Sequence, residues 1–155
     1  MTINSLKSAL AIAIVGGAVS FPAIASAGEC AAADVITSGE TMPVGVTDEV
    51  IASIDLSSKG EAWKGYTFRM RRLVVAAGGV VPWHSHDARP ANILVVEGAI
   101  TEYRSDCRSP IEHKAGEVTE EFGELAHWWK NNTRKPAVLI SADILPPEMV
   151  DDHTM

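Results

Sequence analysis

The feature of this sequence that most constrains its fold is a series of short strand-like runs, separated by turn signals every eight to twelve residues. At least seven such runs follow Ala27, and almost no helical periodicity accompanies them. This pattern is typical of a small barrel or sandwich. We therefore predict an all-β chain, with a turn at Gly78-Gly79 and a hairpin turn at Glu97-Gly98. The predicted strands cover residues 44–56, 66–75, 80–86, 92–97, 99–103, 125–129 and 137–145.

The first 27 residues have the pattern of a secretory signal peptide. Lys7 supplies a basic start, an apolar run covers Ala9 to Val19, and Ala25-Ser26-Ala27 matches a cleavage site. The apolar run is shorter than the ~20 residues that a spanning helix needs, although an uncleaved anchor is the alternative. We therefore predict an exported chain, periplasmic or secreted, whose mature form of 128 residues begins at Gly28.

The charge of the chain excludes one class of partner. The full sequence carries a formal charge of −7, and cleavage would remove Lys7 as the only charged residue of the leader. An acidic chain without a basic stripe repels phosphate backbones, so we expect no nucleic-acid partner. We also expect no membrane association after signal cleavage.

The residues after the leader divide into three segments. Residues 28–60 form an N-terminal extension, in which the strand over residues 44–56 could cover one end of the barrel. Residues 61–147 form the barrel, and residues 148–155 form a flexible acidic tail. Cys30 and Cys107 form an even pair in an exported chain, which permits a disulfide, and two free thiols are the alternative.

Three histidines are candidate metal ligands. His84 and His86 are two residues apart in a predicted strand, so both imidazoles point to the same face. His127 lies in a second apolar run and could reach the same point if the two runs are neighbours. Converging neutral imidazoles suit Zn, Fe, Cu or Ni, whereas the alternative is that each histidine only packs in a half-buried sheet. His113 stands between Glu112 and Lys114, and we assign it to a solvated loop.

The spacing of glycines and histidines around these positions follows two motifs. In the first, Gly78 is followed by five residues, His84-Ser85-His86 and then Gly98; in the second, the register places Gly116, His127 and Asn131. Together they resemble the two motifs of the cupin family. The resemblance implies a double-stranded β-helix, the jelly-roll barrel, with a metal held inside by His84, His86 and His127.

Two positions depart from the family pattern. The position of the family's glutamate ligand is Ala91, and the Pro-x-Gly turn reads Phe122-Gly123-Glu124. The resemblance therefore implies three histidine ligands and no carboxylate at the usual place. Pairing of two barrels into a homodimer is an expectation at the family level only.

The resemblance leads to a first functional hypothesis. We expect a metal-dependent exported enzyme that acts on a small organic molecule, with an Fe(II) dioxygenase as the first expectation and Zn, Mn, Ni or Cu as other candidate ions. Metal-assisted lyase, isomerase or hydrolase chemistry is close behind. The rival hypothesis is a non-enzymatic barrel that binds a metal or a small ligand.

Several polar residues are candidates for the site or for the surface. Arg89 could orient an anionic group and Tyr103 could supply a proton, whereas the alternatives are a solvated loop arginine and a barrel aromatic. The arginines in the run of residues 69–72 are expected at a solvated edge, although one could reach inward to hold a carboxylate. Asn131-Asn132-Thr133 matches a glycosylation acceptor, which matters only if the site is exposed.

Overall fold

The computed structural model describes residues 36–106 and 109–149, and apart from three short 3-10 helices the regular elements within them are all strands. These residues contain no α-helix, which confirms the all-β prediction. The strands are β1 Val44–Asp55, β2 Thr67–Ser85, β3 Ala91–Glu97, β4 Ala99–Arg104, β5 Ile111–Lys114, β6 Val118–Glu121, β7 Ala126–Lys130 and β8 Ala137–Leu145. Three short 3-10 helices complete the set: η1 Ser57–Lys59, η2 Glu61–Trp63 and η3 Pro147–Met149.

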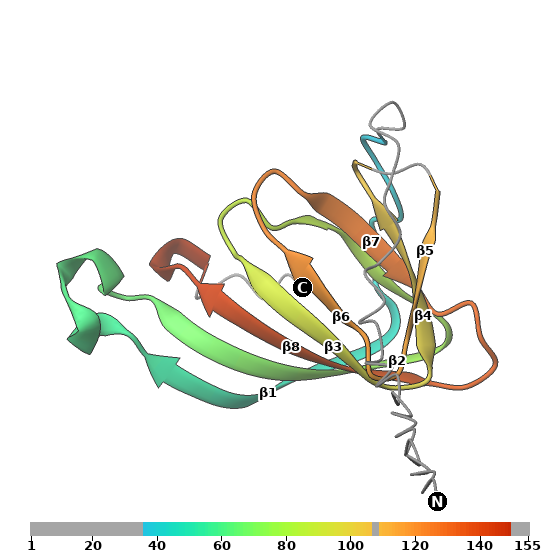
Figure 1. Cartoon of the computed structure of the whole chain (residues 1–155), viewed down its shortest axis with the longest axis horizontal. Helices are drawn as coiled ribbons and strands as arrows, with labels where there is room; N and C mark the ends of the chain where they lie inside the picture. Colours follow the sequence, from blue (N-terminus) through green and yellow to red (C-terminus); the bar gives the residue numbers. More distant parts are fainter. Residues whose placement is uncertain (1–35, 107–108, 150–155) are drawn as a thin grey trace, which may run out of the picture.

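The strands form one curved antiparallel sheet in the order β5-β4-β7-β2-β8-β3-β6, and β1 pairs with β2 outside this path. Figure 1 shows β1, β2, β8 and β3 running side by side, with β7, β4 and β5 forming the other wall. The buried apolar side chains of both walls meet in a single core around Val75, Val95, Ile100 and Trp129. This arrangement is the predicted jelly-roll barrel.

The strand β2 is long because it belongs to both walls. Its first part pairs with β8 as far as Val75, and its last part pairs with β7 from Val80 onward. The turn predicted at Gly78-Gly79 is therefore wrong, since the strand bends there without ending. Gly78 has a φ of +75°, a conformation that residues with a Cβ seldom adopt.

Asn131 holds the bend of β2 in place. Its side-chain amide donates to the carbonyl of Val75 at 2.9 Å and to that of Lys135 at 2.7 Å, and its Oδ1 accepts from the Thr133 backbone at 2.9 Å. Asn131 is the asparagine of the acceptor sequence that would carry a glycan, and it is fully buried, so the folded protein does not expose it for glycosylation. Asn131, the last residue of the second motif, therefore has a structural role: its hydrogen bonds fix the bend of β2.

The hairpin predicted at Glu97-Gly98 is also wrong. Strand β3 pairs with β8 and β6, whereas β4 pairs with β7 and β5, so the chain passes from one wall to the other at Gly98. Gly98 has a φ of +79°, and a Cβ placed on it would lie 2.7 Å from the carbonyl oxygen of Pro136. The glycine that closes the first motif is therefore required by the crossing.

We expect Gly98→Ala to destabilise the fold more than Gly116→Ala. Both glycines have positive φ, and that strain costs about 1–2 kcal/mol for an added Cβ. Only at Gly98 does the Cβ also meet backbone atoms, which should add about 1–3 kcal/mol to the loss of unfolding free energy. Urea denaturation of both variants measures the difference, and equal losses would show that the crossing tolerates a side chain.

Strand β1 lies within the segment assigned to an N-terminal extension. Strand β1 pairs along β2, and almost all of its residues are exposed to solvent, so it widens the sheet and does not cover an end of the barrel.

Some predictions concern residues that the structure does not describe. They are the signal peptide, the pair Cys30 and Cys107, and the tail from residue 150 onward. Among the residues that are described, none belongs to a helix long and apolar enough to span a membrane.

Candidate metal centre

The structure brings the three predicted histidines together inside the barrel. His84 on β2 is paired directly with His127 on β7, and His86 follows immediately after the end of β2. The Nε2 atom of His84 lies 2.9 Å from Nε2 of His86 and 3.2 Å from Nε2 of His127. His86 and His127 are buried, and His84 is partly exposed, so solvent reaches the group on the His84 side.

A carboxylate that the sequence analysis missed joins these imidazoles. Glu121 on β6 has an Oε2 atom 2.9 Å from Nε2 of His86 and 3.6 Å from Nε2 of His127. Its register partner on β3 is Ala91, the position where the family pattern places its glutamate. The carboxylate is therefore present, but it comes from the neighbouring strand. Only the pairing of β3 with β6, which the sequence does not reveal, could have located it.

The ring orientations follow from the partners of the Nδ1 atoms. Nδ1 of His84 contacts the Pro82 carbonyl at 2.8 Å, and Nδ1 of His86 contacts the Arg89 carbonyl at 2.8 Å. Nδ1 of His127 lies 2.6 Å from Oε1 of Glu102. Carbonyl oxygens only accept hydrogen bonds, so Nδ1 of His84 and of His86 carries the proton and the Nε2 of each presents a lone pair. Nδ1 of His127 has two neighbours of opposite kind, because the Trp129 indole, which only donates, also lies 3.1 Å from it.

The four side chains bring several electron-rich atoms together. Three Nε2 atoms and a carboxylate oxygen face one another, with ligand atoms that all lie within 4.8 Å. Lone pairs in such a group repel one another unless a metal cation, or a proton such as one on Glu121, lies among them. Three imidazole nitrogens and one carboxylate oxygen suit a divalent transition metal ion and leave coordination positions for solvent or substrate.

Burial prepares His84, His86 and Glu121 differently for a metal. It lowers the pKa of His86 to about 4 and that of His84 well below its usual value, so both rings are neutral at physiological pH. It raises the pKa of Glu121 to about 7, because the carboxylate loses its hydration. His84 and His86 are therefore ready to ligate, whereas Glu121 must release a proton when an ion binds near or below pH 7.

Behind the histidines, Glu102 links His127 to His113. Its Oε2 atom lies 2.8 Å from Nε2 of His113, which stacks on Trp129 at 4.9 Å between ring centroids. Burial opposes ionisation of Glu102, but its hydrogen bonds to His113 and His127 outweigh this and lower its pKa to about 2. The assignment of His113 to a solvated loop is wrong, because β5 pairs with β4 and turns this ring into the barrel.

We expect Glu102→Gln to weaken metal binding about 10- to 100-fold, since partners of metal-ligating histidines fix the ring and raise its basicity. The matched control is Glu112→Gln, which removes the same charge from an exposed position on β5. Competition against a chromophoric chelator measures both affinities. Identical affinities for Glu102→Gln and the wild type would show that Glu102 serves the fold alone.

The two candidate catalytic residues, Arg89 and Tyr103, lie in different parts of the barrel. Arg89 is 2% exposed and its guanidinium lies 3.7 Å from Asp143, so the expectation of a solvated loop arginine is wrong. Tyr103 stacks on Trp128 with ring centroids 4.0 Å apart, and both rings lie on the face of the sheet opposite to His127. The structure therefore does not bring Tyr103 into the histidine group.

Two of the three arginines on β2, Arg69 and Arg71, also point inward. Arg69 donates to both carboxylate oxygens of Asp143, at 2.9 and 2.8 Å, and Arg71 lies 3.2 Å from the same carboxylate and also pairs with Asp48. Only Arg72 is exposed, as expected for a solvated edge. A charged cluster therefore lines the inner face of the sheet beside the histidines.

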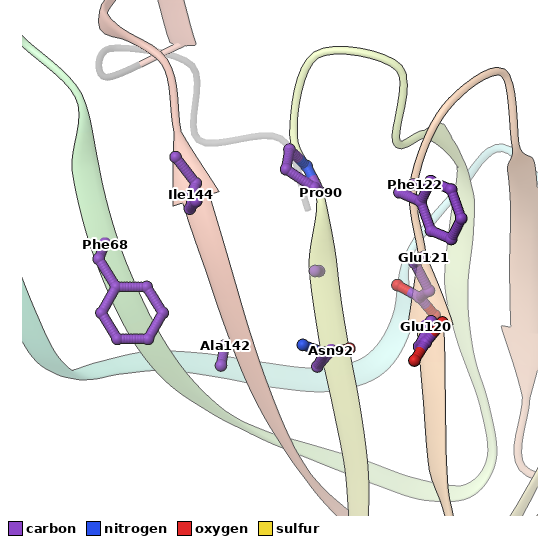
Figure 2. A pocket seen from close by; sticks show the side chains of 9 residues that line it. Phe68, Pro90, Asn92, Glu120, Glu121, Phe122, Ala142 and Ile144 are labelled. Atoms are coloured by element: carbon purple, nitrogen blue, oxygen red, sulfur yellow. The ribbon is translucent and has the colours of Figure 1, made fainter. Parts of the chain in front are cut away.

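An open groove of about 400 Å³ lies on the outer face of the sheet, where the exposed side chains of Phe68, Asn92 and Glu120 line it, and none of the three histidines is among its lining residues. Ala91 and Glu121 line it from the paired strands β3 and β6. Figure 2 shows Pro90, Phe122 and Ile144 around it. Its volume lies within the range of pockets that hold small molecules.

Comparison with known proteins identifies the fold. The sequence matches no family model and no curated protein. The structure is similar to a predicted oxalate decarboxylase from Thermotoga maritima, with a TM-score of 0.52 and 12% identity over 76% of this chain and 99% of that one. It is also similar to KdgF from Halomonas sp., with a TM-score of 0.52 and 13% identity over 68% of this chain and 84% of that one.

A third similar structure is a cupin 2 conserved barrel domain protein from Salinispora arenicola, with a TM-score of 0.50 and 15% identity. That match covers 68% of this chain and 80% of the other. The chain spans only 54% of another matched cupin domain, at a TM-score of 0.45. At these identities the similarity establishes the fold alone: this chain has a cupin fold.

Proposed function

We propose that this cupin-fold chain binds one divalent transition metal ion through His84, His86, His127 and Glu121, and uses it in an enzymatic reaction on a small organic molecule. The observation that carries the proposal is the convergence of three Nε2 atoms on one another and on a buried carboxylate. A structural barrel has no need for this arrangement, because burying four polar side chains together costs free energy that a metal ion or protons must offset.

The chain's own residues supply the surroundings of such an ion. The carbonyls of Pro82 and Arg89 and the carboxylate of Glu102 contact the Nδ1 atoms of the three rings and orient the Nε2 atoms toward one another. Trp129, which is 3% exposed, closes the inner side next to His127 and excludes water there. When bound, the ion would polarise an oxygen ligand or, if it is redox-active, support electron transfer.

Iron(II) remains the first expectation for the ion, with Mn, Ni, Zn and Cu as the alternatives. The added carboxylate makes the donor set harder than three imidazoles alone, which favours Fe or Mn more than the sequence analysis suggested. Cu and Zn bind most tightly to almost any such site, so the ion found after aerobic purification would reflect availability. We also propose that the chain is exported after cleavage at Ala27, which the intact mass of protein from its native host tests.

The test of the proposed function is elemental analysis of protein purified without oxygen and without chelators, followed by oxygen uptake with a panel of small organic acids, phenols and thiols. About one first-row ion per chain, together with oxygen uptake that depends on that ion, supports a metal-dependent oxidoreductase. The absence of any bound ion rejects the metal centre. A full complement of metal without turnover of any substrate class, including lyase and isomerase substrates, favours the rival binding protein.

A further inference from the structure

The hydrogen bonds of the candidate metal centre continue beyond His127 into the second wall of the barrel. Glu102 lies on β4, between β5 and β7, and strand pairing brings His113 and His127 to either side of it. Oε1 of Glu102 lies 2.6 Å from Nδ1 of His127, and Oε2 lies 2.8 Å from Nε2 of His113. The carboxylate therefore joins a candidate ligand to a histidine that lies outside the group of four ligand residues.

This connection is closed to solvent. His113 is 2% exposed, and Glu102 and His127 are fully buried, so water does not compete for their hydrogen bonds. The His113 ring also stacks on the Trp129 indole, with ring centroids 4.9 Å apart and an angle of 30° between the planes. A buried carboxylate is costly without hydrogen-bond donors, so the contact with His113 stabilises Glu102 in this position.

The Nδ1 atom of His127 has a second neighbour, which favours the opposite tautomer of the ring. The Trp129 indole nitrogen lies 3.1 Å from this atom, and an indole nitrogen only donates. A neutral imidazole carries its proton on one nitrogen and accepts at the other. If the indole hydrogen bond prevailed, Nε2 would carry the proton and could not bind a metal ion. If the contact with Glu102 prevails, Nδ1 carries the proton and Nε2 is free.

His113 favours Glu102 in this competition. Trp129 belongs to the buried core cluster, so its indole stays beside Nδ1 of His127. The carboxylate of Glu102, in contrast, lies at the end of a side chain whose last torsion is broad. A hydrogen bond to each carboxylate oxygen fixes this torsion, and Oε1 then lies closer to Nδ1 than the indole nitrogen does. Without His113, one of these two hydrogen bonds is lost and the carboxylate can turn away.

We propose that His113 is a positioning residue for the metal centre: its hydrogen bond holds Glu102 against His127, and this contact keeps Nε2 of His127 free to bind the ion. The inference rests on the proposed metal centre and gives a residue outside the ligand group a role in ligation. The alternative is that the His113 ring only packs against Trp129, in which case its shape matters and its hydrogen bond does not.

Two substitutions separate these roles. His113→Phe keeps a flat ring beside Trp129 and removes the donor, whereas His113→Gln keeps a side-chain N–H and removes the ring. Nitrogen NMR of chelator-treated, isotope-labelled protein shows which nitrogen of His127 carries the proton. We expect this proton on Nδ1 in the wild type and in His113→Gln, and on Nε2 in a large fraction of the His113→Phe molecules.

The affinity for cobalt(II), measured by competition against a chromophoric chelator, is the second readout. We expect His113→Phe to weaken cobalt(II) binding about 10- to 100-fold, which is the typical effect of losing a partner behind a metal-ligating histidine. His113→Gln should recover most of the wild-type affinity, because it restores the donor to Glu102. A role in packing alone predicts the reverse order of the two variants.

Each outcome decides between the two roles. Wild-type affinity and an Nδ1 proton in His113→Phe overturn the proposal and leave the metal centre in place. Weak binding in both variants with the proton still on Nδ1 assigns His113 to packing and overturns it as well. If His113→Phe does not fold, His113→Met, which also lacks a donor, takes its place. A wild type that binds no cobalt(II) rejects the metal centre itself, and the role in ligation falls with it.

Discussion

Glu121→Gln should make the metal-free protein more stable at alkaline pH. Burial raises the pKa of Glu121 from 4.5 to about 7, so ionising this carboxyl costs more in the folded chain than in the unfolded chain. The folded state therefore loses stability as the pH rises from the unfolded pKa through the folded one. Above pH 7 the loss amounts to about 3 kcal/mol, and a neutral glutamine avoids it.

Urea denaturation of chelator-treated protein at pH 4.5 and at pH 8.5 measures this effect. The free energies of unfolding of the wild type and of Glu121→Gln should be similar at pH 4.5 and should differ by about 3 kcal/mol at pH 8.5. Glu120→Gln is the matched control, because Glu120 is the residue next to Glu121 and its carboxylate is exposed on the other face of β6. If Glu121→Gln is no more stable than the wild type at pH 8.5, the buried carboxylate is stabilised by groups that do not depend on a metal.

Metal binding should produce the second large effect, a gain in stability that the wild type shows and that Glu121→Gln largely loses. An ion that binds only the folded state stabilises it by about 2.7 kcal/mol when the free metal is 100 times the dissociation constant. For a chain of this size, the melting temperature should rise on the order of 10 °C. His86→Ala and Glu121→Gln should each remove most of this rise, since each deletes one of the four ligand groups.

Thermal melting with and without added metal, under reducing conditions, provides the measurement. Ser85→Ala serves as the control, because this exposed side chain lies between the two histidines on the opposite face of β2. The affinity should fall as the pH drops below about 7, since the proton on Glu121 then competes with the ion. A full metal-dependent rise in His86→Ala would show that the ion binds elsewhere.

Local patterns in the sequence predicted the elements that depend on local information. The final strand was predicted over residues 137–145, which are the bounds of β8. Period-two alternation placed His84 and His86 on one face, and the structure turns both rings toward His127. These features follow from side-chain alternation along a single strand, which the sequence displays directly.

The residues that were misjudged depend on pairing between distant segments. Glu121 joins the site only because β6 lies beside β3, and the polar residues before it, Thr119 and Glu120, hide its burial in the sequence. His113 stands between two charged residues and Arg89 stands before a proline in a segment expected to be a loop, yet the folded sheet buries both. The hairpin predicted at Gly98 failed for the same reason, because the partners of β3 and β4 lie elsewhere in the chain.

The shared strand β2 restricts how the length of this chain can change in evolution. Its first half carries Arg71 and its second half carries His84, and both side chains face the interior. The two positions are thirteen residues apart, an odd number that strict alternation would place on opposite faces, so the irregular pairing of β2 between Val81 and His84 supplies the extra residue that turns His84 inward. Loss of that irregularity would move His84 to the outer face, so any descendant that keeps the site must keep the irregular pairing as well. The exposed connection over residues 56–66, in contrast, can grow or shrink without moving a single ligand.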